Sequence, residues 1–164
     1  MHSCWRLTKC SRNVVTYRIQ LIVEEAIIRH YRRLLKTDFE NSGAIENPSI
    51  FVEAVGEKMI HCGNTGNYMH LYIVVEDDRI ENIRYVCSCE PTANVAVEAL
   101  CTLVKGKSLD EAAALPEETV YSFVGCRGDE LKVKVRGLLE MLNEGITGYR
   151  RRRYSSGNAA SVQW

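Results

Sequence analysis

Residues 68–89 read YMHLYIVVEDDRIENIRYVCSC and contain the clearest β-hairpin signal in the chain. The first arm alternates apolar and other side chains, which places the apolar ones on one face of a strand. These residues are Met69, Leu71, Ile73 and Val75. The run EDDR forms the turn, and the return arm has its own alternating set of Ile83, Tyr85, Cys87 and Cys89. The hairpin therefore ends in two cysteines, shortly before Pro91.

Upstream of the hairpin, the sequence predicts one further strand and one helix. Residues 50–62, IFVEAVGEKMIHC, form the strand, with an interruption at Gly56. Residues 36–49 form a loop, because they are dense in Asn, Ser, Gly and Pro. Residues 17–35, YRIQLIVEEAIIRHYRRLL, place apolar side chains at helical spacing and predict a helix with arginines near its end.

Downstream of the hairpin, the pattern changes to helices. TANVAVEALCTLVKG follows Pro91 and has Gly106 as its stop. Ser108 and Glu111 have the spacing of a capping box for a short helix. The last helix starts at Asp129 and is predicted to end at Gly145. Strands followed by helices, without βαβ alternation, predict an α+β fold with a small antiparallel three-stranded sheet and helices packed on one face.

The chain of 164 residues divides on this reading into three segments. Residues 1–20 form a basic N-terminal extension, residues 21–146 the folded domain, and residues 147–164 a basic, flexible tail. Lys plus Arg and Asp plus Glu both number 21, so no overall field favours nucleic acid or anionic lipid as a partner. No stretch is long enough to span a bilayer, so we expect no membrane association.

Seven cysteines are a high number for a chain without a secretory signal. In a reducing compartment, cysteines are more often metal ligands or reactive thiols than disulfides. We therefore expect a cytoplasmic protein. Residues 1–23 lack acidic side chains and carry four basic ones, so an organelle matrix is the alternative if this segment is a presequence.

Cysteines stand at three element edges. Cys62 lies before the hairpin, Cys87 and Cys89 end it, and Cys126 precedes the last helix. Antiparallel order permits these positions to meet at one end of the sheet, and thiolates are the ligands that iron and zinc prefer. Cys101 is flanked by core positions of a helix and is interpreted as a packing residue.

The segment from about residue 24 to 144 resembles the U-type iron–sulfur cluster assembly scaffolds, the IscU and NifU N-terminal family. The resemblance is carried by RHY, NSGAIENP, the hairpin sequence and, most specifically, VKGKSLDEA after a cysteine-ended hairpin. It implies a non-enzymatic scaffold that assembles a [2Fe–2S] cluster on three cysteines. It also implies a cysteine desulfurase as sulfur donor and apo iron–sulfur proteins as acceptors. The three positions are Cys62, Cys89 and Cys126.

The sequence departs from the family pattern at its motifs. Counting back from Met69 without gaps places Thr65, not Cys62, at the position of the family's first cysteine. The aspartate that follows this cysteine in the family is replaced by Asn64 or Asn67. Glu90 occupies the position of the family's second cysteine, and Cys89 lies one residue before it. We therefore keep four residues as a fourth or alternate ligand. They are Cys87, Asn64, Glu90 and His61.

Two other functions remain open from the sequence. One is a zinc-bound sulfurtransferase accessory, in which a thiolate attacks a persulfide while zinc orders the site. The other is an interaction module of the same fold without a working site, and a homo-oligomer is possible. The chain has no Walker loop, GxSxG elbow or HExxH, which excludes the common nucleotide-binding and hydrolase signatures.

Overall fold

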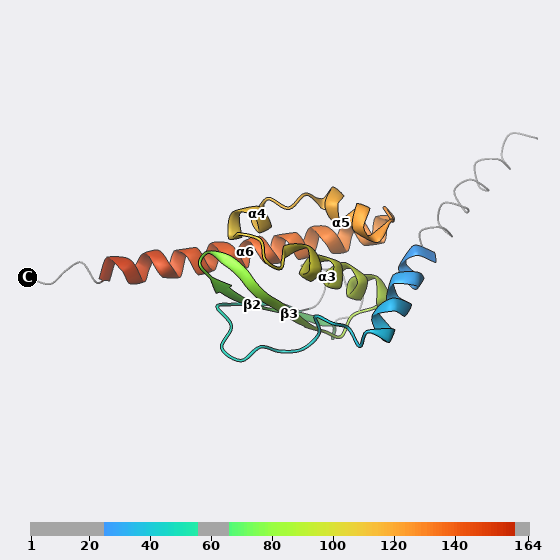
Figure 1. Ribbon diagram of the computed structural model, residues 1–164, viewed down its shortest axis with the longest axis horizontal. Helices are drawn as coiled ribbons and strands as arrows, with labels where there is room; N and C mark the ends of the chain where they lie inside the picture. Colours follow the sequence, from blue (N-terminus) through green and yellow to red (C-terminus); the bar gives the residue numbers. More distant parts are fainter. Residues whose placement is uncertain (1–24, 56–65, 160–164) are drawn as a thin grey trace, which may run out of the picture.

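An antiparallel sheet in the order β1-β2-β3 forms one layer of the computed structural model, which describes residues 25–55 and 66–159 (Figure 1). The strands are β1 (Ile50–Val55), β2 (Tyr68–Glu76) and β3 (Arg79–Cys87). Both strand pairs are antiparallel, as predicted. The central strand β2 buries Met69, Leu71 and Ile73 completely, because alternate side chains point to the same face.

The hairpin turn consists of Asp77 and Asp78, which confirms the turn predicted at EDDR. Both residues have positive φ, 48° and 60°, the conformation of the two-residue turn that matches the twist of a hairpin. A register shift between Val74 and Val75 interrupts the pairing of β2 with β3. Because of such a bulge the burial pattern is not strictly alternating, and Ile80 and Ile83 both face the core.

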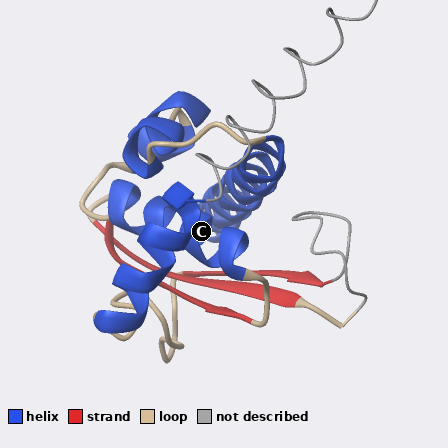
Figure 2. Ribbon diagram, turned by 90° about the vertical axis from the view of Figure 1, so that its right-hand side faces the viewer, coloured by secondary structure: helices blue, strands red, loops and turns tan. Residues whose placement is uncertain are grey.

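Helices cover one face of this sheet (Figure 2). They are α3 (Pro91–Val104), α4 (Leu109–Ala113), α5 (Glu117–Val124) and α6 (Asp129–Ala159). A further helix occupies residues 25–36. The predicted capping box of α4 is present, with both the Ser108 and the Glu111 side chains bonded to backbone N–H groups. The sequence analysis did not predict α5.

The predicted end of the last helix at Gly145 was wrong, because α6 is 31 residues long and ends at Ala159. Gly145 instead marks the crossing of α6 over β1. A Cβ atom there would lie 2.6 Å from Val52 and 2.9 Å from Ile50. A glycine thus allows close helix–strand packing, and residues 147–159, predicted as tail, are helical. Within the described ranges, no helix is long and apolar enough to cross a membrane.

The loop before β1 is fixed to the sheet through buried polar groups. The backbone N–H and side-chain amide of Asn41 donate to Glu98 Oε1 at 3.1 and 2.9 Å. The backbone of residues 41–43 pairs with Tyr85 on the free edge of β3. Burial raises the pKa of Tyr85, and the nearby Glu98 carboxylate raises it further. A buried carboxylate therefore holds the loop against α3 and β3.

Candidate metal centre

The two cysteines of the hairpin lie where β3 ends and the chain turns toward α3. Cys87 is the last strand residue, and Ser88 still pairs with Tyr68 through N–H to O at 3.1 Å. The Cys89 N–H then donates to Cys87 Sγ at 3.1 Å, and the Cys89 thiol donates to the Tyr68 carbonyl at 3.5 Å. Both cysteines are half-buried. The chain therefore bends directly after Cys87, and both thiols are within reach of solvent.

Glu90, next to Cys89, forms an ion pair with a residue that the sequence analysis did not single out. Its carboxylate lies 2.6 Å from Lys134 Nζ. Lys134 is only 3% exposed, whereas Glu90 is 32% exposed. A buried ammonium needs a partner, because its removal from water is costly. The pair joins the beginning of α3 to the second turn of α6.

Cys126 lies in the short connection between α5 and α6. Gly125 ends α5 in the left-handed conformation with φ 73°, a usual place for glycine. The N–H groups of Gly125 and Cys126 both donate to the Tyr121 carbonyl, at 2.8 and 3.3 Å. Cys126 is 6% exposed and belongs to the hydrophobic core. The structure therefore places this candidate ligand at an element edge, as expected, but in a buried environment.

Polar contacts brace the same connection from outside. Tyr121 donates its hydroxyl to Glu117 at 2.6 Å, and Arg136 donates to the same carboxylate at 3.0 Å. Burial and the Glu117 carboxylate raise the pKa of Tyr121 to about 12. Arg127 pairs with Glu118. These contacts hold the first turn of α5 against α6 and the residues that precede it.

Figure 1 shows the beginning of α3 and the α5–α6 connection on the same side of the molecule, opposite the hairpin turn. We call residues 87–91 together with residues 125–129 the cysteine end. The Glu90–Lys134 pair is its direct link between α3 and α6. Cys101, in contrast, lies fully buried in α3, where burial raises its pKa. That is the environment predicted for a packing residue.

Three of the predicted site residues lie outside the described ranges. They are Cys62, His61 and Asn64. The convergence of Cys62 with Cys89 and Cys126 therefore stays a prediction. Across residues 25–55 and 66–159, no group of three or more His, Cys, Asp or Glu side chains could by itself hold a metal ion. The described part supplies Cys87, Cys89 and Cys126 but no complete ligand set.

The sequence held a signal for Lys134 that the analysis did not use. Leu131, Val135 and Leu138 form the inward stripe of α6. Position 134 is three residues after Leu131 and four before Leu138, so it falls on the same face. A lysine inside an apolar stripe indicates a buried charge with a partner. Its partner Glu90 was considered only as a ligand.

Comparison with known protein families gives one match. The model of the NifU-like N terminal domain matches residues 23–156. No curated protein matches the chain.

Solved structures show the same fold at low sequence identity. A candidate iron–sulfur cluster assembly scaffold protein for the SUF system from Fervidobacterium islandicum AW-1 has a TM-score of 0.55 and 16% identity, over 74% of this chain and 94% of that one. A hypothetical protein has a TM-score of 0.50 and 18% identity, over 65% and 87%. A NifU-like N-terminal protein from Brucella abortus has a TM-score of 0.47 and 9% identity, over 68% and 86%.

Proposed function

The chain belongs to the family of NifU-like N terminal domains, and from that membership we propose that it is an iron–sulfur cluster assembly scaffold. Its cargo is a [2Fe–2S] cluster, held by the thiolates of Cys62, Cys89 and Cys126. Sulfur comes from a cysteine desulfurase, and the finished cluster passes to apoproteins. The similarity in fold to a candidate scaffold of the SUF system supports the same function.

The observation that supports the proposal is the contact between two helices that each begin next to a candidate cysteine ligand. Cys89 precedes the start of α3 and Cys126 precedes the start of α6. The Glu90–Lys134 pair at 2.6 Å brings these helix beginnings together. Two candidate ligands, far apart in sequence, thus belong to elements that contact each other beside the hairpin. In this proposal Cys62, which precedes β2 in the sequence, supplies the third thiolate.

The environment of these cysteines suits a site that receives and releases its cargo. Cys87 and Cys89 are half-buried, so a partner protein can reach them. A thiolate there attacks the outer sulfur of the donor's persulfide. The donor's S–S bond breaks, a new S–S bond forms on the scaffold, and the donor cysteine leaves as its thiolate.

The remaining candidate ligands differ in their readiness to bind metal. Glu90 is already paired with Lys134, so a metal would have to displace an ammonium that is nearly buried. Cys87 accepts an N–H from Cys89, which keeps its sulfur close to the primary ligand. We therefore assign Cys87 as the relay or alternate ligand. Asn64 and His61 remain further alternates beside Cys62.

Anaerobic reconstitution of the full chain with ferrous iron and sulfide tests this function. We expect about two iron and two sulfide ions per chain and the Mössbauer spectrum of a [2Fe–2S] cluster. The triple variant Cys62→Ser, Cys89→Ser, Cys126→Ser is the control and should stay colourless. A colourless wild type with one tightly held zinc would instead support the zinc-bound accessory. A wild type without metal under both aerobic and anaerobic conditions would support the interaction module.

A further inference from the structure

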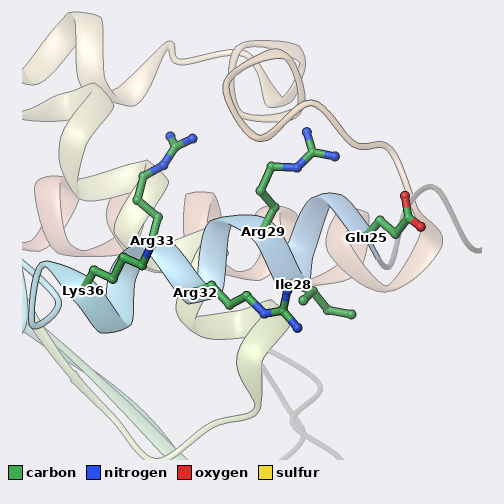
Figure 3. Close-up of a pocket in the computed structure, with 6 residues that line it drawn as sticks. All are labelled: Glu25, Ile28, Arg29, Arg32, Arg33 and Lys36. Carbon is green, nitrogen blue, oxygen red and sulfur yellow. The ribbon is translucent and has the colours of Figure 1, made fainter.

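The helix of residues 25–36 carries a continuous basic stripe on its exposed face. At 100° per residue, Arg29, Arg32, Arg33 and Lys36 fall within one sector of the helix. Ile27, on the opposite side, is buried in the core, and Ala26, next to the sector of the cations, is buried as well. Together with Glu25 and Ile28, the four cations line an open cavity of about 520 Å³ (Figure 3). We call these four cations the basic face.

Two exposed apolar side chains border the basic face on one side. Ile28 is 47% and Leu35 is 57% exposed, and their spacing of seven residues places them on the same edge of the helix. Figure 3 shows Arg29 and Arg33 extending to one side of the helix, with Arg32 and Ile28 on the other. The surface therefore combines a row of cations with an apolar border.

The charges of the basic face are not neutralised within the described part of the chain. Among those residues, the salt bridges of the structure involve other cations, including Lys134 and Arg150. The local excess is four cations against the single carboxylate of Glu25. A net charge of zero for the chain thus conceals a strongly basic surface. Such a surface attracts an acidic partner and speeds its association.

The basic face lies beside the cysteine end. The ring of His30 packs 6.3 Å from that of Phe123, near the end of α5. A hydrogen bond links His30 to the backbone of Val124, two residues before Cys126. Figure 1 shows the same helix next to the beginning of α3 and the α5–α6 connection. A protein bound to this helix would therefore stand next to the proposed ligands.

We propose that the basic face is the docking surface for an acidic patch on the sulfur-donating cysteine desulfurase. The inference rests on the proposed function, because the donor must hold its persulfide close to Cys89 and Cys126 during transfer. Ile28 and Leu35 contact an apolar spot at the border of that acidic patch. The four cations provide long-range attraction and ion pairs, and the apolar border provides the contact from which water is excluded.

An acidic protein surface fits this helix better than an anionic lipid membrane or a nucleic acid. Two apolar side chains are too few for the helix to lie in a lipid interface, which needs a continuous apolar face. Contacts with nucleic acid are mainly contacts with phosphate groups. The exposed apolar side chains of Ile28 and Leu35 would not be buried by such contacts. Glu24 and Glu25 are the only acidic residues in the sequence from 1 to 36, so cations outnumber carboxylates in this segment.

The experiment compares the binding of the full chain and two charge-reversal variants to a purified cysteine desulfurase from the same cell. The test variant is Arg29→Glu, Arg32→Glu, Arg33→Glu. The matched control is Arg151→Glu, Arg152→Glu, Arg153→Glu, which changes the same charge on an exposed stretch of α6. Calorimetry at 50 and 300 mM salt gives Kd. We expect the test variant to bind at least about tenfold more weakly at 50 mM salt, and the control within about twofold of wild type.

Reconstitution with chemical sulfide separates this inference from the proposed function. The test variant should hold as much iron as wild type, because its substitutions lie outside the ligand set. Equal binding of the test variant and wild type, equal loss in both variants, or no binding of wild type at 50 mM salt would overturn the inference. So would tighter binding of wild type to phosphatidylserine vesicles or to duplex DNA than to the desulfurase. A wild type that docks but holds no iron would overturn only the proposed function.

Discussion

At the hairpin-turn end of the sheet, main-chain hydrogen bonds tie the strands to the helical layer, whereas at the cysteine end the corresponding ties are largely side-chain contacts. Ile80 N–H donates to Lys107 O at 2.8 Å, and Gly106 N–H donates back to Ile80 O at 2.8 Å. Leu109 N–H donates to Asp78 O at 2.9 Å. These bonds do not depend on the identity of the side chains.

The cysteine end relies instead on the Glu90–Lys134 ion pair and on the thiol of Cys89 bonded to the Tyr68 carbonyl. Side-chain contacts of this kind can be exchanged for a ligand while the backbone stays in place. The comparison teaches that a scaffold can be rigid at one end and adaptable at the other. Cys126 is only 6% exposed, so it could bind a cargo only after the α5–α6 connection rearranged.

The largest expected effect comes from removing a thiol at the adaptable end. Cys89→Ser should abolish stable binding of the cluster after anaerobic reconstitution, because it removes one of three thiolates. Cys87→Ser should retain a cluster with a changed absorption spectrum or slower assembly. Iron content per chain and the visible spectrum measure both effects.

Cys101→Ala is the control for these thiol variants, because Cys101 lies fully buried in α3. It should keep full iron content and cost at most about 2 kcal/mol of unfolding free energy. Loss of iron in Cys101→Ala, or the reverse ranking of Cys87 and Cys89, would contradict the assignment.

The next effect concerns α6, which connects the two ends and crosses β1 at Gly145. Gly145→Ala should lower the free energy of unfolding by about 2 kcal/mol, because its Cβ would overlap Val52 and Ile50. Gly148→Ala, one turn further, meets only Arg152 at 3.6 Å and should stabilise the helix by up to about 1 kcal/mol. Urea denaturation followed by circular dichroism measures both. Equal effects at the two glycines would mean that α6 does not pack closely on β1.

A smaller effect is expected at the rigid end. Ser108→Ala removes the N-cap of α4 and should cost about 1 kcal/mol. Iron content after reconstitution should stay at the wild-type value, because the turn end carries no candidate ligand. Thermal unfolding and iron analysis of the same sample check both statements. A cluster lost together with this cap would show that the two ends are coupled, contrary to the comparison.

The smallest effect concerns pH and His30, in the helix beside the cysteine end. Burial and the nearby Arg33 hold the pKa of His30 below its ordinary value of 6.5. Below pH 6.5 the unfolded chain therefore binds more protons at this residue than the folded chain, so the free energy of unfolding decreases as the pH is lowered. His30→Gln should lose less stability than wild type between pH 7.5 and pH 5.5, measured as the urea midpoint. An identical pH dependence in both proteins would refute this assignment.

Much of the fold follows from local sequence signals. The alternation in β2, the turn at Asp77 and Asp78, and the Ser108 capping box are set by neighbouring residues, and all three were predicted. Gly145 was misread as a helix stop, because its function is to allow contact with β1, which no local pattern reveals. The failure to predict α5 has a similar cause, since its eight residues are held partly by contacts with distant residues such as Arg136–Glu117.

The candidate site was less predictable than the fold. The positions of Cys89 and Cys126 at element edges follow from the sequence pattern. The burial of Cys126 and the pairing of Glu90 with Lys134 do not, because both depend on how α6 packs against α3. Such contacts between distant segments require the tertiary structure.

Zinc K-edge X-ray absorption on the zinc-loaded chain tests the central claim most directly, because zinc without sulfide counts only protein sulfur ligands. We predict three sulfur neighbours at ~2.3 Å in wild type and two in Cys62→Ser. This result would show that Cys62 binds the same metal ion as Cys89 and Cys126. A wild-type spectrum with one sulfur neighbour or none, or a sulfur count unchanged in Cys62→Ser, would contradict the account.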